Sequence, residues 1–144
     1  MTPYVLGFMF NESRDHVVLL EKNRPNWQAG CLNGLGGKIE KNESPWMAMV
    51  REYQEEAGVL TDMNHWTHYC DLIGDDYTVF IFSCFNQEYL QASRTKEDES
   101  VMVFSVDEIS HRRCVSNVPW LVHLALDENY SKPFQVTANY CKKD

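Results

Sequence analysis

The sequence predicts an α/β fold, because short runs typical of strands alternate with two longer runs whose apolar residues recur at helical spacing. The expected strands are residues 4–10, 16–21, 66–72, 77–85, 101–106 and 134–137. A polar hairpin turn at 11–15 joins the first two strands, and the glycine-rich segment 32–40 is expected to be a loop with a short strand. This alternation excludes an all-helical bundle.

The first helix is expected between Ser44 and Gly58. A serine followed by Pro45 is typical of a helix start, because the hydroxyl caps free N–H groups and proline is accepted in the first turn. A glycine often ends a helix in the left-handed conformation. A second helix is expected at 117–126, with Ser116 or Asn117 as its cap, and the polar segment 87–98 is expected to be a long loop.

Several glutamates and one arginine gather on and just before the first helix. Glu52, Glu55 and Glu56 are spaced i, i+3 and i+4, so their side chains converge on one flank of the helix. These carboxylates repel one another, and the stretch 44–58 contains no lysine that would make it an ordinary solvated face. Hard oxygen ligands suit Mg²⁺ or Mn²⁺. The pattern therefore predicts a metal-dependent enzyme that acts on phosphates.

The segment from Gly37 to Val59 resembles the Nudix box, the signature of hydrolases that cleave nucleoside diphosphates linked to another moiety. It reads as a glycine, a glutamate at Glu43, and then Arg-Glu-aromatic-x-Glu-Glu-x-Gly-apolar from Arg51. Tyr53 stands where the family prefers Ile, Leu or Val. The resemblance implies the Nudix fold, a mixed β-sheet sandwiched between α-helices with the box as a loop–helix–loop. It implies a single domain over residues 1–144.

The same resemblance implies roles for the residues of the box. The implied metal ligands are the Gly37 carbonyl and the carboxylates of Glu52, Glu55 and Glu56. Arg51 and Glu43 would be the supporting pair, and Glu99 matches a loop acid that binds metal or activates water. The implied cofactor is Mg²⁺, with Mn²⁺ as a substitute. A bound water would attack phosphorus, with Glu55 or Glu99 as the general base.

The run from Asn33 to Lys38 is similar to that of the mutT-type nucleoside triphosphatases that act on oxidised purines. The resemblance implies that Asn33 hydrogen-bonds the purine edge and that Trp27 covers the base. The alternatives are that Asn33 is a turn residue and that Trp27 is a partly buried loop anchor. Lys38 is a candidate phosphate contact, or else a surface charge. Asn117 falls at a base-recognition position, but Ser116 and Asn117 replace two aspartates there, which weakens the case for 8-oxopurine selectivity.

The expected reaction is hydrolysis of a (d)NTP or oxidised (d)NTP to the monophosphate and pyrophosphate. Tyr77 stands at the spacing that marks diadenosine polyphosphate enzymes, so a dinucleoside polyphosphate is an alternative substrate, as is an ADP-ribose-type compound. An alternative of another class is a Nudix-like sensor that binds nucleotide without turnover. The retained box carboxylates favour an enzyme.

The amino-acid composition limits the expected cellular location and binding partners of the protein. The chain has 144 residues, 44% hydrophobic and 24% charged, which suits one compact domain. A net charge of −8 argues against a nucleic-acid polymer as partner. The five cysteines are scattered, and neither a signal-peptide start nor a long apolar run is found. We expect a cytoplasmic monomer or homodimer with a small nucleotide substrate and no membrane partner.

Overall fold

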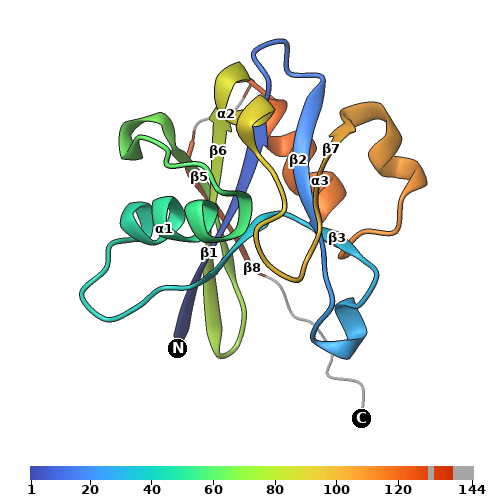
Figure 1. The fold of residues 1–144 in the computed structure, drawn as a ribbon. Helices are drawn as coiled ribbons and strands as arrows, with labels where there is room; N and C mark the ends of the chain where they lie inside the picture. The colour runs from blue at the N-terminus through green and yellow to red at the C-terminus, as the bar shows by residue number, and fades with distance from the viewer. Residues whose placement is uncertain (130–131, 138–144) are drawn as a thin grey trace.

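The computed structural model describes residues 1–129 and 132–137, whose strands form one mixed sheet of eight strands (Figure 1). The strands are β1 (Thr2–Phe10), β2 (His16–Glu21), β3 (Leu32–Asn33), β4 (Leu35–Lys38), β5 (Thr67–Ile73), β6 (Tyr77–Phe85), β7 (Val101–Ser105) and β8 (Phe134–Thr137). Their main order is β3-β2-β1-β6-β5-β8, while β4 pairs with β1 and β7 pairs with β2. Strand β4, which carries Gly36 and Gly37 of the candidate site, pairs with the central strand β1.

The sheet is mixed because its two longest strands run parallel. β1 and β6 pair in parallel along their whole length, and β5 and β8 also pair in parallel, whereas the other pairings are antiparallel. The expected hairpin between β1 and β2 is confirmed. The Asn11 side-chain oxygen accepts hydrogen bonds from the N–H groups of Asp15 and His16, both 3.0 Å long, which closes the turn.

Helices cover both faces of the sheet (Figure 1). They are α1 (Pro45–Ala57), α2 (Gln87–Ala92) and α3 (Val118–Leu126), with 3₁₀ turns at η1 (Asn26–Gln28), η2 (Met63–His65) and η3 (Val106–His111). Successive residues of a strand point to opposite faces, so Val17 and Leu19 of β2 pack in the core with α3, while Val18 and Leu20 pack in the core with α1. A mixed sheet between helices confirms the predicted fold class.

The ends of α1 are those that its sequence predicts. The Ser44 hydroxyl accepts a 3.1 Å hydrogen bond from the Met47 N–H, and Pro45 is the first helical residue. Gly58 ends the helix with a φ of 73°, in the left-handed region. The face of α1 that packs on the sheet is buried at Ala48, Met49, Tyr53 and Ala57.

Two expectations about local structure were wrong. Residues 87–98 are not one long loop, because α2 occupies 87–92; the Asn86 side chain caps it by accepting a 2.9 Å hydrogen bond from the Tyr89 N–H. The segment 32–40 contains two short strands, because β3 pairs with β2 while β4 pairs with β1. Within the described part of the chain, no helix has the length and apolar character needed to cross a lipid bilayer.

Candidate active site

The glycine-rich strand β4 lies directly against the acidic flank of α1. A Cβ atom on Gly37 would stand 2.6 Å from the Glu52 Oε1 atom, closer than real Cβ atoms approach an oxygen. A side chain at position 37 would therefore displace the Glu52 carboxylate from its place on β4. On the next residue, the Gly36 N–H donates a 2.8 Å hydrogen bond to Glu56 Oε1. The two glycines hold two of the three helix glutamates in place.

Arg51 lies at the centre of a network of carboxylates. It donates two hydrogen bonds to Glu43, 2.7 Å from Nε to Oε2 and 2.9 Å from Nη2 to Oε1. It also donates to Glu52 at 2.9 Å, to Glu55 at 3.3 Å and to the Lys38 carbonyl at 3.1 Å. The hydrogen bonds from Arg51 hold the pKa of Glu43 below its ordinary value. Arg51 therefore joins the start of the box to its helix.

Two glutamates of α1 resist ionisation. Burial, together with the neighbouring charge of Glu52, raises the pKa of Glu56 to about 8, against the opposing hydrogen bond from Gly36. Burial also raises the pKa of Glu52, against the opposing interactions with Arg51. These carboxylates lack enough positive charge around them, and a cation placed between them would relieve that deficit.

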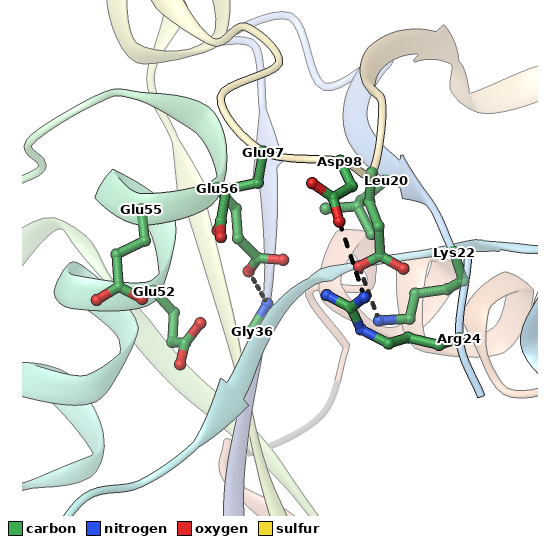
Figure 2. Close-up of a pocket in the computed structure, with 10 residues that line it drawn as sticks. Leu20, Lys22, Arg24, Gly36, Glu52, Glu55, Glu56, Glu97 and Asp98 are labelled. Atoms are coloured by element: carbon green, nitrogen blue, oxygen red, sulfur yellow. Dashed lines mark hydrogen bonds and ion pairs between the residues drawn. The ribbon is translucent and has the colours of Figure 1, made fainter.

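The glutamates line a cavity of about 200 Å³, here called the carboxylate pocket (Figure 2). Its acidic lining comes from α1 and from the loop before β7: Glu52, Glu55, Glu56, Glu97, Asp98 and Glu99. Leu20, Lys22, Arg24 and Gly36 complete it. In Figure 2 the box glutamates lie on one side of the pocket, and the two basic side chains lie on the other.

Glu99, the expected loop acid, is engaged away from the helix glutamates. Its Oε2 atom accepts a 2.6 Å hydrogen bond from the Asn23 N–H, and its Oε1 atom lies 3.2 Å from the Lys22 ammonium. Burial acts to raise its pKa, but Asn23 and Lys22 together bring that pKa below its ordinary value. Glu97 lies closer to the box, since its charge contributes to the raised pKa values of both Glu52 and Glu56.

The donors of the pocket fit a hard divalent cation by their chemistry. They are carboxylate oxygens, partly desolvated, in the one cavity where the glutamates of α1 meet the acid-rich loop. Within residues 1–129 and 132–137, however, no three acidic, His or Cys side chains are grouped closely enough to hold a metal ion as they stand. The reason is visible in the hydrogen bonds, because Arg51 draws Glu52 and Glu55 toward itself while Gly36 holds Glu56.

A second cavity of about 1270 Å³, here called the large cavity, adjoins the carboxylate pocket. It contains three of the four residues expected to bind substrate, which are Trp27, Asn33 and Asn117. Trp27 is 69% exposed, which leaves its ring free to stack on a base. The Asn33 side-chain oxygen accepts a 2.8 Å hydrogen bond from the Gly34 N–H, as expected of a turn residue, and its amide nitrogen can still donate.

Asn117 and Lys38 differ in where the structure places them. The Oδ1 atom of Asn117 is buried without a hydrogen-bond partner among the described residues, and such atoms are uncommon in folded proteins. A ligand in the large cavity could supply the missing donor. Lys38 is exposed on β4 and lines neither cavity, so the structure does not bring its side chain to the other expected substrate residues.

Three residues line both cavities: Lys22, Gly36 and Glu56. These shared residues connect the large cavity, which is lined by apolar and amide groups, to the carboxylate pocket. The sequence pattern alone assigns neither Lys22 nor Glu97 to the site. Neither position carries a local signal, because both depend on how distant loops fold against α1.

Comparisons with known proteins show the family and the fold. A family model for the NUDIX domain matches residues 1–123. The fold resembles that of a MutT protein from Bacillus halodurans, with a TM-score of 0.73 at 20% identity over 97% of this chain and 90% of that one. It also resembles the NUDIX domain of Shewanella oneidensis NrtR complexed with ADP ribose, with a TM-score of 0.74 at 14% identity over 86% and 85% of the two chains.

A NUDIX family hydrolase from Clostridium perfringens has a TM-score of 0.65 at 22% identity, over 88% of this chain and 98% of that one. At these identities the likeness shows a shared fold. A search of curated proteins found no match. The expected Nudix fold is thus confirmed, and because the family model covers most of the sequence, the protein belongs to the Nudix family of hydrolases.

Proposed function

We propose that the protein hydrolyses a phosphoanhydride bond of a nucleoside triphosphate, oxidised or not, to give the nucleoside monophosphate and pyrophosphate. The observation that carries this proposal is the junction of the two cavities at Lys22, Gly36 and Glu56. A nucleotide has one aromatic end and one polyanionic end, and the two cavities differ in the same way. The base would lie in the large cavity and the phosphates in the carboxylate pocket.

The polyanionic end requires a cation, since the pocket contains more carboxylates than basic groups. We assign Mg²⁺, or Mn²⁺ in its place, to Glu52, Glu55, Glu56 and the Gly37 carbonyl. When bound, the ion supplies a Lewis acid that neutralises the phosphate oxygens and lowers the pKa of a bound water. Arg51 donates hydrogen bonds to both Glu52 and Glu55, which holds them on the same side of the pocket.

The general base is assigned to Glu55 rather than Glu99. The Glu55 side chain is 52% exposed, and one of its oxygens accepts a 3.3 Å hydrogen bond from Arg51. Its other oxygen would face the ion and, when not coordinated to it, would accept a proton from water. Glu99 is committed to Asn23 and Lys22, and its lowered pKa makes it a weaker base. Its role is to hold Lys22 at the junction, where an ammonium group faces the phosphates.

Recognition of the base is assigned to three residues of the large cavity. Trp27 offers an exposed aromatic face, the Asn33 amide nitrogen offers a donor, and Asn117 Oδ1 offers an unpartnered acceptor. A purine edge that presents one acceptor and one donor fits this pair. Without paired aspartates at these positions, we expect modest rather than strict preference for an oxidised purine.

The proposal is tested with a panel of nucleotides at fixed Mg²⁺, in which the products are identified by chromatography. The panel contains the (d)NTPs, 8-oxo-dGTP, ADP-ribose, NADH and Ap₄A. We expect pyrophosphate and a monophosphate from at least one (d)NTP, and loss of turnover on removal of Mg²⁺ with a chelator. Glu55→Gln should abolish turnover with the fold intact. Turnover of ADP-ribose alone would overturn the assignment of substrate.

A dinucleoside polyphosphate is the second candidate, and Tyr77 supports it. Tyr77 lines the large cavity together with Tyr4, on the side formed by the first residues of β1 and β6. Trp27 and these tyrosines would offer separate aromatic surfaces to two bases. A preference for Ap₄A over every (d)NTP in the panel, lost in Tyr77→Ala, would favour this reading. Tight nucleotide binding without turnover would instead favour a sensor.

A further inference from the structure

Tyr53 is the one position at which the box departs from the family pattern, and its hydroxyl reaches out of α1 toward another element. The ring is fully buried and packs on Trp66, with centroids 5.4 Å apart. The hydroxyl oxygen lies 2.6 Å from Ser93 Oγ. Ile, Leu or Val would fill the same core position without reaching Ser93, so the tyrosine adds a hydrogen bond that the usual residues cannot make.

The direction of this hydrogen bond follows from the partner of Ser93. The Ser93 hydroxyl donates a 2.7 Å hydrogen bond to the carbonyl of Tyr89, one turn back in α2. A serine hydroxyl has a single proton, so Ser93 accepts from Tyr53. Ser93 is also the residue that ends α2. The Tyr53 hydroxyl is thus bonded to the point where the chain leaves α2 for the loop before β7.

That loop, residues 94–100, is here called the acid loop because it carries Glu97, Asp98 and Glu99. Its first residue follows Ser93, and the Arg94 N–H donates a 3.0 Å hydrogen bond to the Ala57 carbonyl at the end of α1. Its far end is closed by Thr95, whose hydroxyl oxygen accepts a 2.9 Å hydrogen bond from the Val101 N–H. The loop is therefore tied to α1 at one end and to β7 at the other.

The position of Glu97 depends on these ties. Glu97 itself is exposed, and no hydrogen bond shorter than 3.5 Å to a described residue holds its carboxylate. Yet it lines the carboxylate pocket with Glu52 and Glu56 (Figure 2). Its place is thus set by the backbone of the acid loop rather than by contacts of its own.

We propose that the Tyr53 hydroxyl is a positioning group, which through Ser93 fixes the start of the acid loop so that Glu97 faces the metal ligands on α1. This inference rests on the proposed function for the identity of those ligands. Tyr53 is fully buried and lines neither cavity. It links the helix that carries three of the pocket's acidic residues to the loop that carries the other three.

The test compares Tyr53→Phe, which removes only the hydroxyl, with Tyr69→Phe as a matched control. Tyr69 is equally buried, and its hydroxyl donates a 2.9 Å hydrogen bond to the Leu121 carbonyl on the other face of the sheet. The measurements are the Mn²⁺ dissociation constant of the metal-free protein by calorimetry and the hydrogen exchange of amides 94–100. We expect Tyr53→Phe to weaken Mn²⁺ binding by about tenfold and to speed exchange in the acid loop. Tyr69→Phe should change neither.

A double-variant cycle separates positioning from general destabilisation. Glu97→Gln should also weaken Mn²⁺ binding, and adding Tyr53→Phe to it should cause less than about a twofold further loss, because both changes act through one side chain. Fully additive losses, or a Tyr53→Phe protein that binds Mn²⁺ like the wild type, would overturn the positioning role. If the wild-type protein binds no Mn²⁺, the proposed metal site is wrong. If the hydrogen exchange of amides 94–100 is unchanged in Tyr53→Phe, the anchoring of the acid loop by Tyr53 is wrong.

Discussion

Gly37 and Glu52 are packed so closely that a Cβ atom on Gly37 would stand 2.6 Å from the Glu52 carboxylate. A side chain at position 37 would therefore have to move the Glu52 carboxylate. Gly37 does not have a left-handed φ, so a substitution there acts through the Glu52 side chain and not through backbone strain.

Gly37→Ala is therefore expected to displace the Glu52 side chain while leaving the backbone of β4 in place. Because Glu52 is an assigned metal ligand, kcat/KM with Mg²⁺ should fall by about 10- to 100-fold. Steady-state kinetics measure the loss, and circular dichroism checks the fold. A Gly37→Ala enzyme with wild-type kcat/KM would show that the position of Glu52 does not matter for catalysis.

Arg51→Lys is expected to fail as a conservative change. Lysine keeps the charge but cannot make the paired hydrogen bonds from Nε and Nη2 to Glu43 while also reaching Glu52. We expect the free energy of unfolding to fall by about 1–2 kcal/mol and kcat to fall by about tenfold or more. Urea denaturation and steady-state kinetics measure the two effects.

Arg112→Lys is the matched control for Arg51→Lys. Arg112 also pairs with a glutamate, Glu108, but both side chains are largely exposed and lie outside the two cavities. Its replacement should change stability by less than about 0.5 kcal/mol and leave kcat unchanged. Equal effects of the two replacements would refute the special role of Arg51.

The raised pKa of Glu56 makes the stability of the metal-free protein depend on pH. Below about pH 4.5 the carboxyl is protonated in both the folded and the unfolded chain. As the pH rises from there to about 8, the unfolded chain ionises this group while the folded chain keeps its proton, so stability is lost through that window. Because each unit of pKa shift corresponds to about 1.4 kcal/mol, we expect Glu56→Gln to gain more than about 1 kcal/mol over the wild type between pH 5 and pH 8.

Urea denaturation of both proteins at the two pH values, in the presence of a chelator, measures that difference. Subtracting the two proteins removes the contribution of every other titrating group. Parallel pH profiles of the wild type and Glu56→Gln would show that Glu56 is ionised in the folded protein at neutral pH.

Trp27→Ala is expected to weaken substrate binding without harming the chemistry. Trp27 is 69% exposed, so its loss should leave the core intact. Stacking on a base is worth about 1–3 kcal/mol, so KM should rise by about tenfold while kcat changes less than twofold. Leu60→Ala removes another exposed apolar side chain, 67% exposed and outside both cavities, and should change neither constant. Unchanged KM in Trp27→Ala would exclude stacking.

Local signals predicted much of this structure. Ser44, Pro45 and Gly58 mark the ends of α1 because capping depends only on neighbouring residues. The strands of the sheet follow from apolar runs whose residues become the core on its two faces. The 87–92 helix was missed because it is too short to show a clear period.

The arrangement of the candidate site depended on contacts between distant segments. The Glu97-Asp98-Glu99 run does not show which acid faces α1, because that depends on hydrogen bonds from Tyr53 and Arg94. The large cavity likewise joins residues near 27, 77 and 117, and no short pattern in the sequence relates them. The box is visible as a short sequence pattern, whereas the residues around it can be identified only from the three-dimensional structure.

The central claim is that the crowded glutamates beside Gly36 and Gly37 form a site for a divalent cation. Calorimetric titration of Mn²⁺ into the chelator-treated protein at neutral pH tests it most directly, with the Glu52→Gln/Glu56→Gln double variant alongside. We predict a saturable binding event in the wild type that is lost in the double variant. No binding in the wild type, or the same binding in both proteins, would contradict the claim.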